Sequence, residues 1–230
     1  MTPITERFRD LLAIYDSLEP GCADTWNPLQ NDWELAYRLS LFFCATTALR
    51  LIDRPASSLK VLDFGCGNGR SSRMYVDLGL RPEQIIGLDL RDGAIERARA
   101  SNPAIEFMTY DGHEIPFPDG TFDWISCSTV FSSIATRETR RDVAGQIQRK
   151  LKSGAFAFYF DMVRANTFAG SDKISPLELF SALDPLYHYK FSSRQFLPAP
   201  GIARHVLRAA RHGLVGRVNP THEALLARQN

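Results

Sequence analysis

The sequence predicts an α/β fold in which a mostly parallel sheet lies between two layers of helices. Three observations support this prediction. Short apolar runs alternate with helical stretches along the middle of the chain, an order that gives parallel strands joined by helical crossovers. The first two runs carry an acidic residue near their ends, and such sheets bind ligands at the carboxyl ends of their strands. Glycines at alternate positions separate the first run from the helix that follows.

The glycine-rich turn at 61–70 (VLDFGCGNGR) is the most specific of these features. Asp63 lies in the apolar run, and the turn then places a glycine at every second position, Gly65, Gly67 and Gly69. Glycine is required where a strand turns sharply into a helix and its backbone passes close to a ligand, because a side chain would block the turn or the approach. Cys66 lies inside this turn, where we expect only its backbone to matter.

The offset between this turn and a second acid predicts a nucleoside ligand. Asp89 closes the apolar run at 85–89, twenty residues after Gly69, and nucleoside-binding α/β domains place a carboxylate near this offset to bind ribose hydroxyls. Dinucleotide turns read G-x-G-x-x-G and leave the helix N-terminus free for a pyrophosphate. An acid at Asp63 suits a ligand with a positive end instead. S-adenosyl-L-methionine carries a sulfonium and an ammonium and no phosphate, so it is the predicted cofactor.

Three later runs extend the pattern. Residues 105–110 predict a third strand that ends at Asp111, residues 116–125 a turn and a fourth strand, and residues 151–160 a turn and a fifth strand. In order and spacing, residues 61–161 resemble the class I S-adenosyl-L-methionine-dependent methyltransferases. The resemblance implies a Rossmann-like, doubly wound, mostly parallel sheet of seven strands whose seventh is antiparallel. It also implies S-adenosyl-L-homocysteine as the product formed from the cofactor.

The resemblance further implies a role for each cofactor-binding position. Asp63 orders the turn and meets the ammonium, directly or through water. Asp89 takes the ribose hydroxyls, and Leu90 packs on the adenine. Asp111 accepts a hydrogen bond from the adenine amino group, and Gly112 lets the backbone approach. Together with the contacts discussed next, the predicted cofactor-binding residues are Asp63, Gly65, Cys66, Gly67, Gly69, Asp89, Leu90, Asp111, Gly112, Cys127, Ser128, Tyr37 and Arg38.

Some of these contacts lie on the acceptor side of the site. The segment 126–133, which contains Cys127 and Ser128, follows the fourth strand, and in small-molecule methyltransferases it borders the methionine end of the cofactor. It lacks the Asn-Pro-Pro-Tyr of many amino- and nucleic-acid-modifying members, which disfavours methylation of exocyclic amines of DNA bases. Tyr37 can close over the cofactor and Arg38 can bind its carboxylate; ordinary packing of the N-terminal helices is the alternative for both.

No strong catalytic motif is present, and the reaction requires none. Methyl transfer from a sulfonium is an in-line displacement with a good leaving group, and proximity and orientation alone are worth roughly 7–11 kcal/mol. A general base helps if the acceptor is a hydroxyl. The candidate catalytic residues are His113, Asp161 and His205. The alternative for His113 is a loop histidine without a role, and the alternative for Asp161 is a helix or turn cap. The alternative for His205 is a residue on a solvated helix.

Residues 1–230 are predicted to form one domain, because a chain of 230 residues can bury one good core and is short for two. Residues 1–55 form a helical cap, and residues 56–162 form the cofactor-binding core. Residues 163–230 form a substrate lid and the last strands. Within the cap and the lid we expect helices at 4–18, 31–52, 175–183 and 200–214, and strands at 186–197 and 223–228.

The composition argues against several other classes of protein. A net charge of +1 gives no basic footprint for nucleic acid. The four cysteines are scattered without a C-x-x-C pair, so we expect neither a disulfide framework nor a zinc or other metal site. The N-terminus lacks a signal-peptide pattern, and the longest apolar run, at 39–49, is too short to cross a bilayer. We therefore expect a cytoplasmic protein without a membrane span.

A finer resemblance points to the class of acceptor. Several segments resemble a bacterial subgroup associated with surface-glycan or secondary-metabolite pathways, namely 26–29, 37–38, 69–72, 129–134, 198–204 and 221–222. Where that subgroup has Lys-Pro-Gly-Gly before the fifth strand, this chain has KSGA at 152–155. The expected function is methyl transfer to a small molecule, at a hydroxyl of a saccharide or secondary metabolite. The alternatives are a catalytically silent scaffold subunit and an NAD-dependent oxidoreductase. The sequence leaves a monomer and a homodimer equally open.

Overall fold

The strands of the molecule form one twisted sheet in the order β3-β2-β1-β4-β5-β7-β6. The computed structural model describes residues 8, 12, 28–29, 31–162, 175–191 and 222–230. The strands are β1 (Val61–Phe64), β2 (Ile85–Asp89), β3 (Glu106–Thr109), β4 (Phe122–Ser128), β5 (Leu151–Met162), β6 (Asp184–Phe191) and β7 (His222–Arg228). The first five run parallel, and β7 is antiparallel to both β5 and β6. The predicted doubly wound, seven-stranded fold is thus confirmed.

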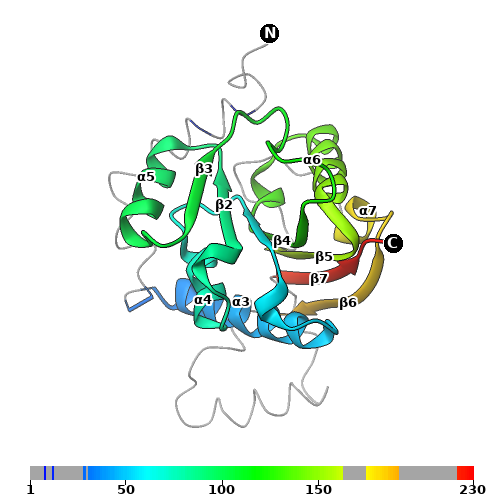
Figure 1. Ribbon diagram of the computed structural model, residues 1–230, viewed down its shortest axis with the longest axis horizontal. Coiled ribbons are helices and arrows are strands. Elements are labelled where there is room, and N and C mark those ends of the chain that lie inside the picture. Colours follow the sequence, from blue (N-terminus) through cyan, green and yellow to red (C-terminus); the bar gives the residue numbers. More distant parts are fainter. Residues whose placement is uncertain (1–7, 9–11, 13–27, 30, 163–174, 192–221) are drawn as a thin grey trace.

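Helices cover both faces of this sheet (Figure 1). The α-helices are α3 (Asp32–Leu51), α4 (Arg70–Asp77), α5 (Asp92–Ser101), α6 (Arg137–Lys150) and α7 (Pro176–Leu179), and the 3₁₀ turns are η2 (Ala56–Ser58), η3 (Pro82–Gln84) and η4 (Phe131–Ser133). One apolar core lies between the sheet and α3, α4 and α5. The other lies between the sheet and α6 and α7. None of the described helices combines the length and apolar character that a bilayer crossing requires.

The central strand β1 is buried along its whole length because it lies between two other strands and two helical layers. Strands in that position read as continuous apolar runs. Asp63 breaks the run, and the register places it between Gly87 of β2 and Ser126 of β4. A carboxylate in the middle of a sheet is costly to bury, so its surroundings are central to the site described below.

Helix α3 confirms the prediction for residues 31–52. The side chain of Asn31 accepts hydrogen bonds from the backbone N–H groups of Trp33 and Glu34 and so caps the first turn. The helix packs against the sheet through small side chains that are almost completely buried, among them Ala36, Cys44, Ala45 and Ala48. Small residues let the helix axis come close to the sheet. The first turns of α3 therefore reach the carboxyl ends of β4 and β5.

The region after residue 162 differs in detail from the prediction. Helix α7 ends at Leu179 rather than continuing to Leu183, since a turn closed by the Leu183 N–H on the Phe180 carbonyl brings both of these side chains into the core. Strand β6 begins at Asp184 because that residue already pairs with Arg228. The predicted helices at 4–18 (apart from residues 8 and 12) and 200–214 lie outside the described residues, as does the end of the predicted strand at 186–197.

Candidate functional site

The glycine turn leaves β1 at the carboxyl edge of the sheet, and its geometry explains its composition. Gly65, Gly67 and Gly69 have φ angles of 73°, 55° and 80°, in the left-handed region that favours glycine. A Cβ on Gly65 would lie 2.5 Å from Cγ2 of Val130, whereas a Cβ on Gly67 would meet only Nη2 of Arg91, at 3.6 Å. The backbone at Gly67 is therefore open to close approach by a ligand.

Asp89 is joined directly to this turn. Its Oδ2 accepts a hydrogen bond from the Gly67 N–H at 2.8 Å, and its Oδ1 accepts from the backbone N–H and Nε of Arg91 at 3.0 and 3.2 Å. The Gly65 and Cys66 N–H groups bond the Leu88 carbonyl at 2.7 and 3.1 Å. The predicted pairing of the glycine turn with the acid of the second strand is thus a physical contact. Carboxylate oxygens can accept further hydrogen bonds, so Asp89 can also hold a ligand hydroxyl.

Asp63 is the most unusual group of the site, because it is fully buried and only one of its oxygens is occupied. Oδ2 accepts hydrogen bonds from the hydroxyls of Ser71 and Ser72, both at 2.6 Å. Oδ1 has no hydrogen-bond partner among the described residues. Burial raises the pKa of this carboxyl to about 6, although the serine hydroxyls oppose the shift. A positive ligand group near this carboxyl would fit both its charge and its unpartnered oxygen.

The adenine side of the predicted site is assembled from the ends of β2 and β3. A Cβ on Gly112 would lie 3.1 Å from Cδ2 of Leu90 and the same distance from the Phe8 ring. The structure therefore brings Leu90 and Gly112 together. Asp111 is exposed beside them, and its Oδ1 accepts a hydrogen bond from the His113 N–H at 3.0 Å.

The first turns of α3 cover the end of β4. The Tyr37 hydroxyl lies 3.3 Å from Oγ1 of Thr129, the one non-glycine residue with positive φ among those described. Burial raises the pKa of the Tyr37 hydroxyl, and the nearby charges of Asp161, Glu34 and Asp63 raise it further. Left-handed backbone at a bulky residue stores strain and is typical of functional sites. Tyr37 thus lies at the edge that the sequence predicts for the cofactor.

Arg38 is bound to a residue that sequence reasoning missed. Its Nε donates to Oε1 of the buried Glu34 at 2.7 Å, and Nη1 of Arg70 donates to the same oxygen at 3.0 Å. Arg70 is the first residue of α4, directly after Gly69. A glutamate four residues before an arginine on one helix is a signal that the sequence offers, but its contact with α4 is tertiary.

Cys127 and Ser128 point to opposite faces of β4. Cys127 lies in the core beneath α6, and burial raises the pKa of its thiol. Ser128 is almost fully buried, and its Oγ has no partner among the described residues. Of the two predicted contacts, only the Ser128 side chain is therefore available on the Tyr37 side of the sheet.

The predicted catalytic residues have different neighbours. His113 is exposed in the loop after β3, where its carbonyl accepts a hydrogen bond from Nε2 of Gln146 in α6, and Asp161 lies at the end of β5. The Asp161 oxygens accept hydrogen bonds from the backbone N–H groups of Ser132 at 3.0 Å and Met162 at 2.8 Å, and burial raises the pKa of this carboxyl to about 6. His205 lies outside the described residues.

His222 is a second residue that was not among the predicted site residues. It is buried at the start of β7, where its ring stacks on Phe160 at 5.5 Å and lies within 6.0 Å of the Trp33 and Tyr37 rings. Burial lowers the pKa of the His222 imidazole to about 4, so the ring is neutral at pH 7. The sequence does not predict this aromatic cluster, because the neighbours of His222 come from α3 and β5, which are far from β7 in the chain.

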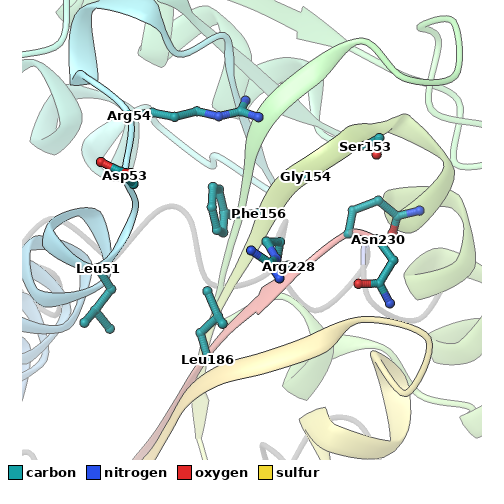
Figure 2. Close-up of a pocket in the computed structure, with 10 residues that line it drawn as sticks. Leu51, Asp53, Arg54, Ser153, Gly154, Phe156, Leu186, Arg228 and Asn230 are labelled. Carbon is teal, nitrogen blue, oxygen red and sulfur yellow. The ribbon is translucent and has the colours of Figure 1, made fainter.

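A cavity of about 550 Å³ lies at the opposite, amino edge of the sheet (Figure 2). Its lining comes from the end of α3, the first part of β5 and the end of β7, with Leu51, Asp53, Arg54, Ser153, Gly154, Phe156, Leu186, Arg228, Gln229 and Asn230. None of the predicted site residues borders it. Open α/β sheets bind their ligands at the carboxyl edge, so we do not assign the cofactor to this cavity. Within the described residues, no group of three His, Cys, Asp or Glu side chains is arranged to hold a metal ion.

In comparisons with known sequences, the part of the chain that matches other proteins is the part that forms the predicted cofactor site. Residues 61–154 match the model of a family described as a methyltransferase domain. The tRNA (carboxymethyluridine(34)-5-O)-methyltransferase of Saccharomyces cerevisiae is 37% identical over 111 residues, which cover 48% of this chain and 37% of the yeast protein. The chain therefore spans little more than a third of the length of this curated relative.

Two solved structures share the fold over most of the chain. An S-adenosylmethionine dependent methyltransferase from Mesorhizobium loti has a TM-score of 0.56 at 18% identity and covers 79% of this chain and 96% of its own. A chain in the complex between the Haloferax volcanii Trm112 methyltransferase activator and a methyltransferase has a TM-score of 0.62 at 16% identity, covering 90% and 96%. At such identities the likeness shows the fold alone.

The matched family spans the glycine turn, Asp89 and the next two strands of the sheet, and this family and fold imply S-adenosyl-L-methionine as the cofactor. The unpartnered, buried oxygen of Asp63 and the unobstructed backbone at Gly67 suit such a ligand. Residues 61–154 of this chain therefore match a methyltransferase domain, and the sheet has the fold of the class I, S-adenosyl-L-methionine-dependent methyltransferases.

Proposed function

We propose that this protein transfers a methyl group from S-adenosyl-L-methionine to an oxygen atom of a small-molecule acceptor, such as a hydroxyl of a saccharide or secondary metabolite. The observation that carries the proposal is Asp63, a buried carboxylate whose Oδ1 has no partner among the described residues, beside a turn joined to Asp89. An acid for a positive group and an acid for ribose hydroxyls then lie on either side of one glycine turn.

When bound, the cofactor supplies an electrophilic methyl group on a sulfonium. The chain's own residues hold it. Asp63 holds the ammonium through Oδ1, Asp89 holds the ribose hydroxyls, and Leu90 and Gly112 hold the adenine, with Asp111 at its amino group. The open backbone at Gly67 admits close contact. These roles need orientation rather than proton transfer, and orientation is the main requirement of a displacement with a good leaving group.

The carboxyl ends of β4 and β5 and the amino end of β7 form the acceptor side in this proposal. Tyr37 and Thr129 border it, and Asp161 supports it by accepting the backbone N–H of Ser132 in η4. Both Asp161 oxygens already accept backbone hydrogen bonds, which favours a positioning role over that of a base. Transfer to oxygen agrees with the yeast relative, which is a tRNA (carboxymethyluridine(34)-5-O)-methyltransferase.

Calorimetric titration tests the cofactor. We expect micromolar binding of S-adenosyl-L-homocysteine and none of NADH. Binding of NADH alone would contradict the proposal in favour of an oxidoreductase. Heat-denatured protein is checked for released S-adenosyl-L-homocysteine, so that a prebound cofactor is not mistaken for absent binding.

Methyl transfer is then measured with methyl-labelled S-adenosyl-L-methionine. The acceptors are sugars, phenols, simple carboxylic acids and, as a separate class, unfractionated tRNA. Label on a small hydroxyl compound supports the proposal. Label on tRNA alone would contradict the small-molecule acceptor, and cofactor binding without transfer to any acceptor would favour a scaffold subunit.

A further inference from the structure

The cavity at the amino edge of the sheet has the size and the mixed lining of a small-molecule site (Figure 2). Its volume of about 550 Å³ falls within the range of roughly 300–1,000 Å³ that is usual for such sites. Phe156, Leu51 and Leu186 supply an apolar wall, and Leu51 and Leu186 are 50% and 44% exposed. Apolar side chains exposed in a cavity favour a ligand with an apolar surface, since contact removes both surfaces from water.

One arginine of the lining is held in place by the protein. Nη1 of Arg54 donates to Oδ1 of Asp123 at 3.1 Å, and a Cβ on Gly154 would lie only 3.3 Å from Nη2 of Arg54. The buried Asp123 also accepts a hydrogen bond on Oδ2 from Nζ of Lys152, at 2.7 Å. One carboxylate therefore balances two cations, and the Arg54 side chain is still 37% exposed.

The second arginine of the lining has no partner in the protein. The Arg228 side chain makes no ion pair and no hydrogen bond with any described residue. Arg228 pairs with Phe156 across β5 and β7, so both side chains stand on the face of the sheet that α3 covers. The buried Oε1 of Gln229 also has no hydrogen-bond partner within the described part of the chain. Against the two arginines, the lining contains one acid, Asp53.

We propose that this cavity binds a small organic anion, in which a carboxylate is attached to an apolar or aromatic body. The carboxylate binds Arg228, because a guanidinium group pairs with a carboxylate through two parallel N–H···O bonds. The body lies against Phe156 and Leu186, and Arg54 adds positive charge to the same cavity. An arginine without a protein acid, next to an apolar wall on the same face of the sheet, selects such an anion over a neutral or cationic ligand.

The anion is distinct from the methyl acceptor of the proposed function. Phe156 lies five residues before Asp161 on β5, which corresponds to about 16 Å along a strand. Asp161 belongs to the carboxyl edge, where we propose that the cofactor binds, whereas the cavity borders the amino edge. A ligand in the cavity is therefore out of reach of the transferred methyl group, and this inference does not rest on the proposed function.

The competing explanation is a solvent-filled gap without any ligand preference. Calorimetry therefore compares two acids with their uncharged amides, indole-3-acetate with indole-3-acetamide and octanoate with octanamide. The variants are Arg228→Ala and Leu186→Ala, both at exposed positions. Arg50→Ala is the matched control, because Arg50 is an exposed arginine in the last turn of α3 that does not line the cavity. Thermal unfolding of each variant confirms that it is folded at the titration temperature.

We expect at least one acid to bind the unmodified protein about tenfold more tightly than its amide, or better, because only the acid can pair with the guanidinium. Arg228→Ala removes this preference and leaves the affinity for the amide unchanged. Leu186→Ala weakens acid and amide alike, and Arg50→Ala changes neither. The affinities stay the same in protein saturated with S-adenosyl-L-homocysteine, which we expect at the other edge of the sheet.

The proposal is overturned if acids and amides bind equally well, if neither acid binds at millimolar concentration, or if Arg228→Ala and Arg50→Ala have the same effect. Competition between the bound acid and S-adenosyl-L-homocysteine would also overturn it, since the anion would then lie at the cofactor edge. Failure of S-adenosyl-L-homocysteine itself to bind would contradict the proposed function and would leave the comparison of acids and amides valid.

Discussion

At the scale of single residues, the carboxylates of Asp89 and Asp63 differ in how completely the protein satisfies their hydrogen-bonding capacity. Asp89 is held by three N–H donors at the end of β2 and is fixed in orientation. Asp63 is held on one oxygen by two serine hydroxyls and is open on the other. Burial without a countercharge favours the protonated form of Asp63. A ligand cation would reverse that preference, and this links cofactor binding to pH.

We predict that the affinity for S-adenosyl-L-homocysteine falls as the pH is lowered below about 6. The pKa of Asp63 is raised to about 6 in the free protein, and an ammonium next to Oδ1 lowers it again, so binding at lower pH must release a proton. The expected loss is about tenfold per pH unit between pH 6 and 4. Calorimetry across this range measures it. Asp63→Asn should bind more weakly and lose this slope; an unchanged slope in that variant would assign the proton to another group, such as Asp161.

We also predict that Asp89→Ala weakens binding of S-adenosyl-L-homocysteine tenfold or more, at least about 1.4 kcal/mol. The change removes the acceptor for the ribose hydroxyls and also the acceptor for the Gly67 and Arg91 N–H groups. Asp77→Ala, at an exposed position at the end of α4, is the control. Unchanged affinity in a folded Asp89→Ala variant would refute the role assigned to Asp89.

The turn between β1 and α4 is the decisive element, because its backbone serves both folding and binding. Left-handed backbone costs a residue other than glycine roughly 1–2 kcal/mol. At Gly65 the packing of Val130 adds a direct obstruction, while a Cβ at Gly67 would meet only Nη2 of Arg91, at 3.6 Å, and would occupy space needed by the ligand. Gly120 shares the positive φ, at 65°, and a Cβ there would meet nothing within 4 Å. A comparison of substitutions at Gly65 and Gly120 therefore separates the cost of a left-handed backbone from the cost of a steric clash.

We predict that Gly65→Ala costs at least about 3 kcal/mol of unfolding free energy and abolishes cofactor binding, whereas Gly120→Ala costs about 1 kcal/mol and leaves binding unchanged. Urea unfolding and calorimetry measure the two effects. Adding Val130→Ala to Gly65→Ala should recover part of the lost stability. If the double variant were no more stable than Gly65→Ala, contact with Val130 would not be the source of the additional cost.

At the scale of the whole molecule, β7 completes the sheet. It lies between β5 and β6, and its residues Ala224 and Leu226 are fully buried in the core beneath α3. Its first residue, His222, packs against Trp33 and Tyr37 of α3. The last strand in the sequence therefore connects the helical layer near the N-terminus with the centre of the sheet.

We predict that Leu226→Ala lowers the free energy of unfolding by about 2–5 kcal/mol, the range for large-to-small changes in a packed core. Leu186→Ala, on the neighbouring β6 where the side chain is 44% exposed, should cost less than about 1 kcal/mol. Chemical denaturation followed by circular dichroism compares them. Equal losses of unfolding free energy in the two variants would show that these positions on β6 and β7 contribute equally to stability, despite their different burial.

Features that depend on residues close together in the sequence could be predicted from it, and features that depend on distant residues could not. The strands at 85–89 and 223–228, and the helix at 31–52, were predicted closely because apolar pattern, caps and proline act within a few residues. The contact of Asp89 with the glycine turn was predictable because both lie at the carboxyl ends of adjacent parallel strands. Helix α7 was predicted too long, since the burial of Phe180 and Leu183 overrides the local helical signal.

The doubly wound fold, the edge of the sheet that carries the site, and the residues of the glycine turn follow from the sequence alone, because each depends on short-range pattern and spacing. Which side chains lie next to one another follows from the packing of the folded chain. It joined Glu34 of α3 to Arg70 of α4, placed His222 of β7 against Tyr37, and brought the loop at His113 against Gln146 of α6. The physical reason is that these contacts join residues far apart in the chain, whose positions are fixed by strand order and helix packing rather than by neighbouring residues.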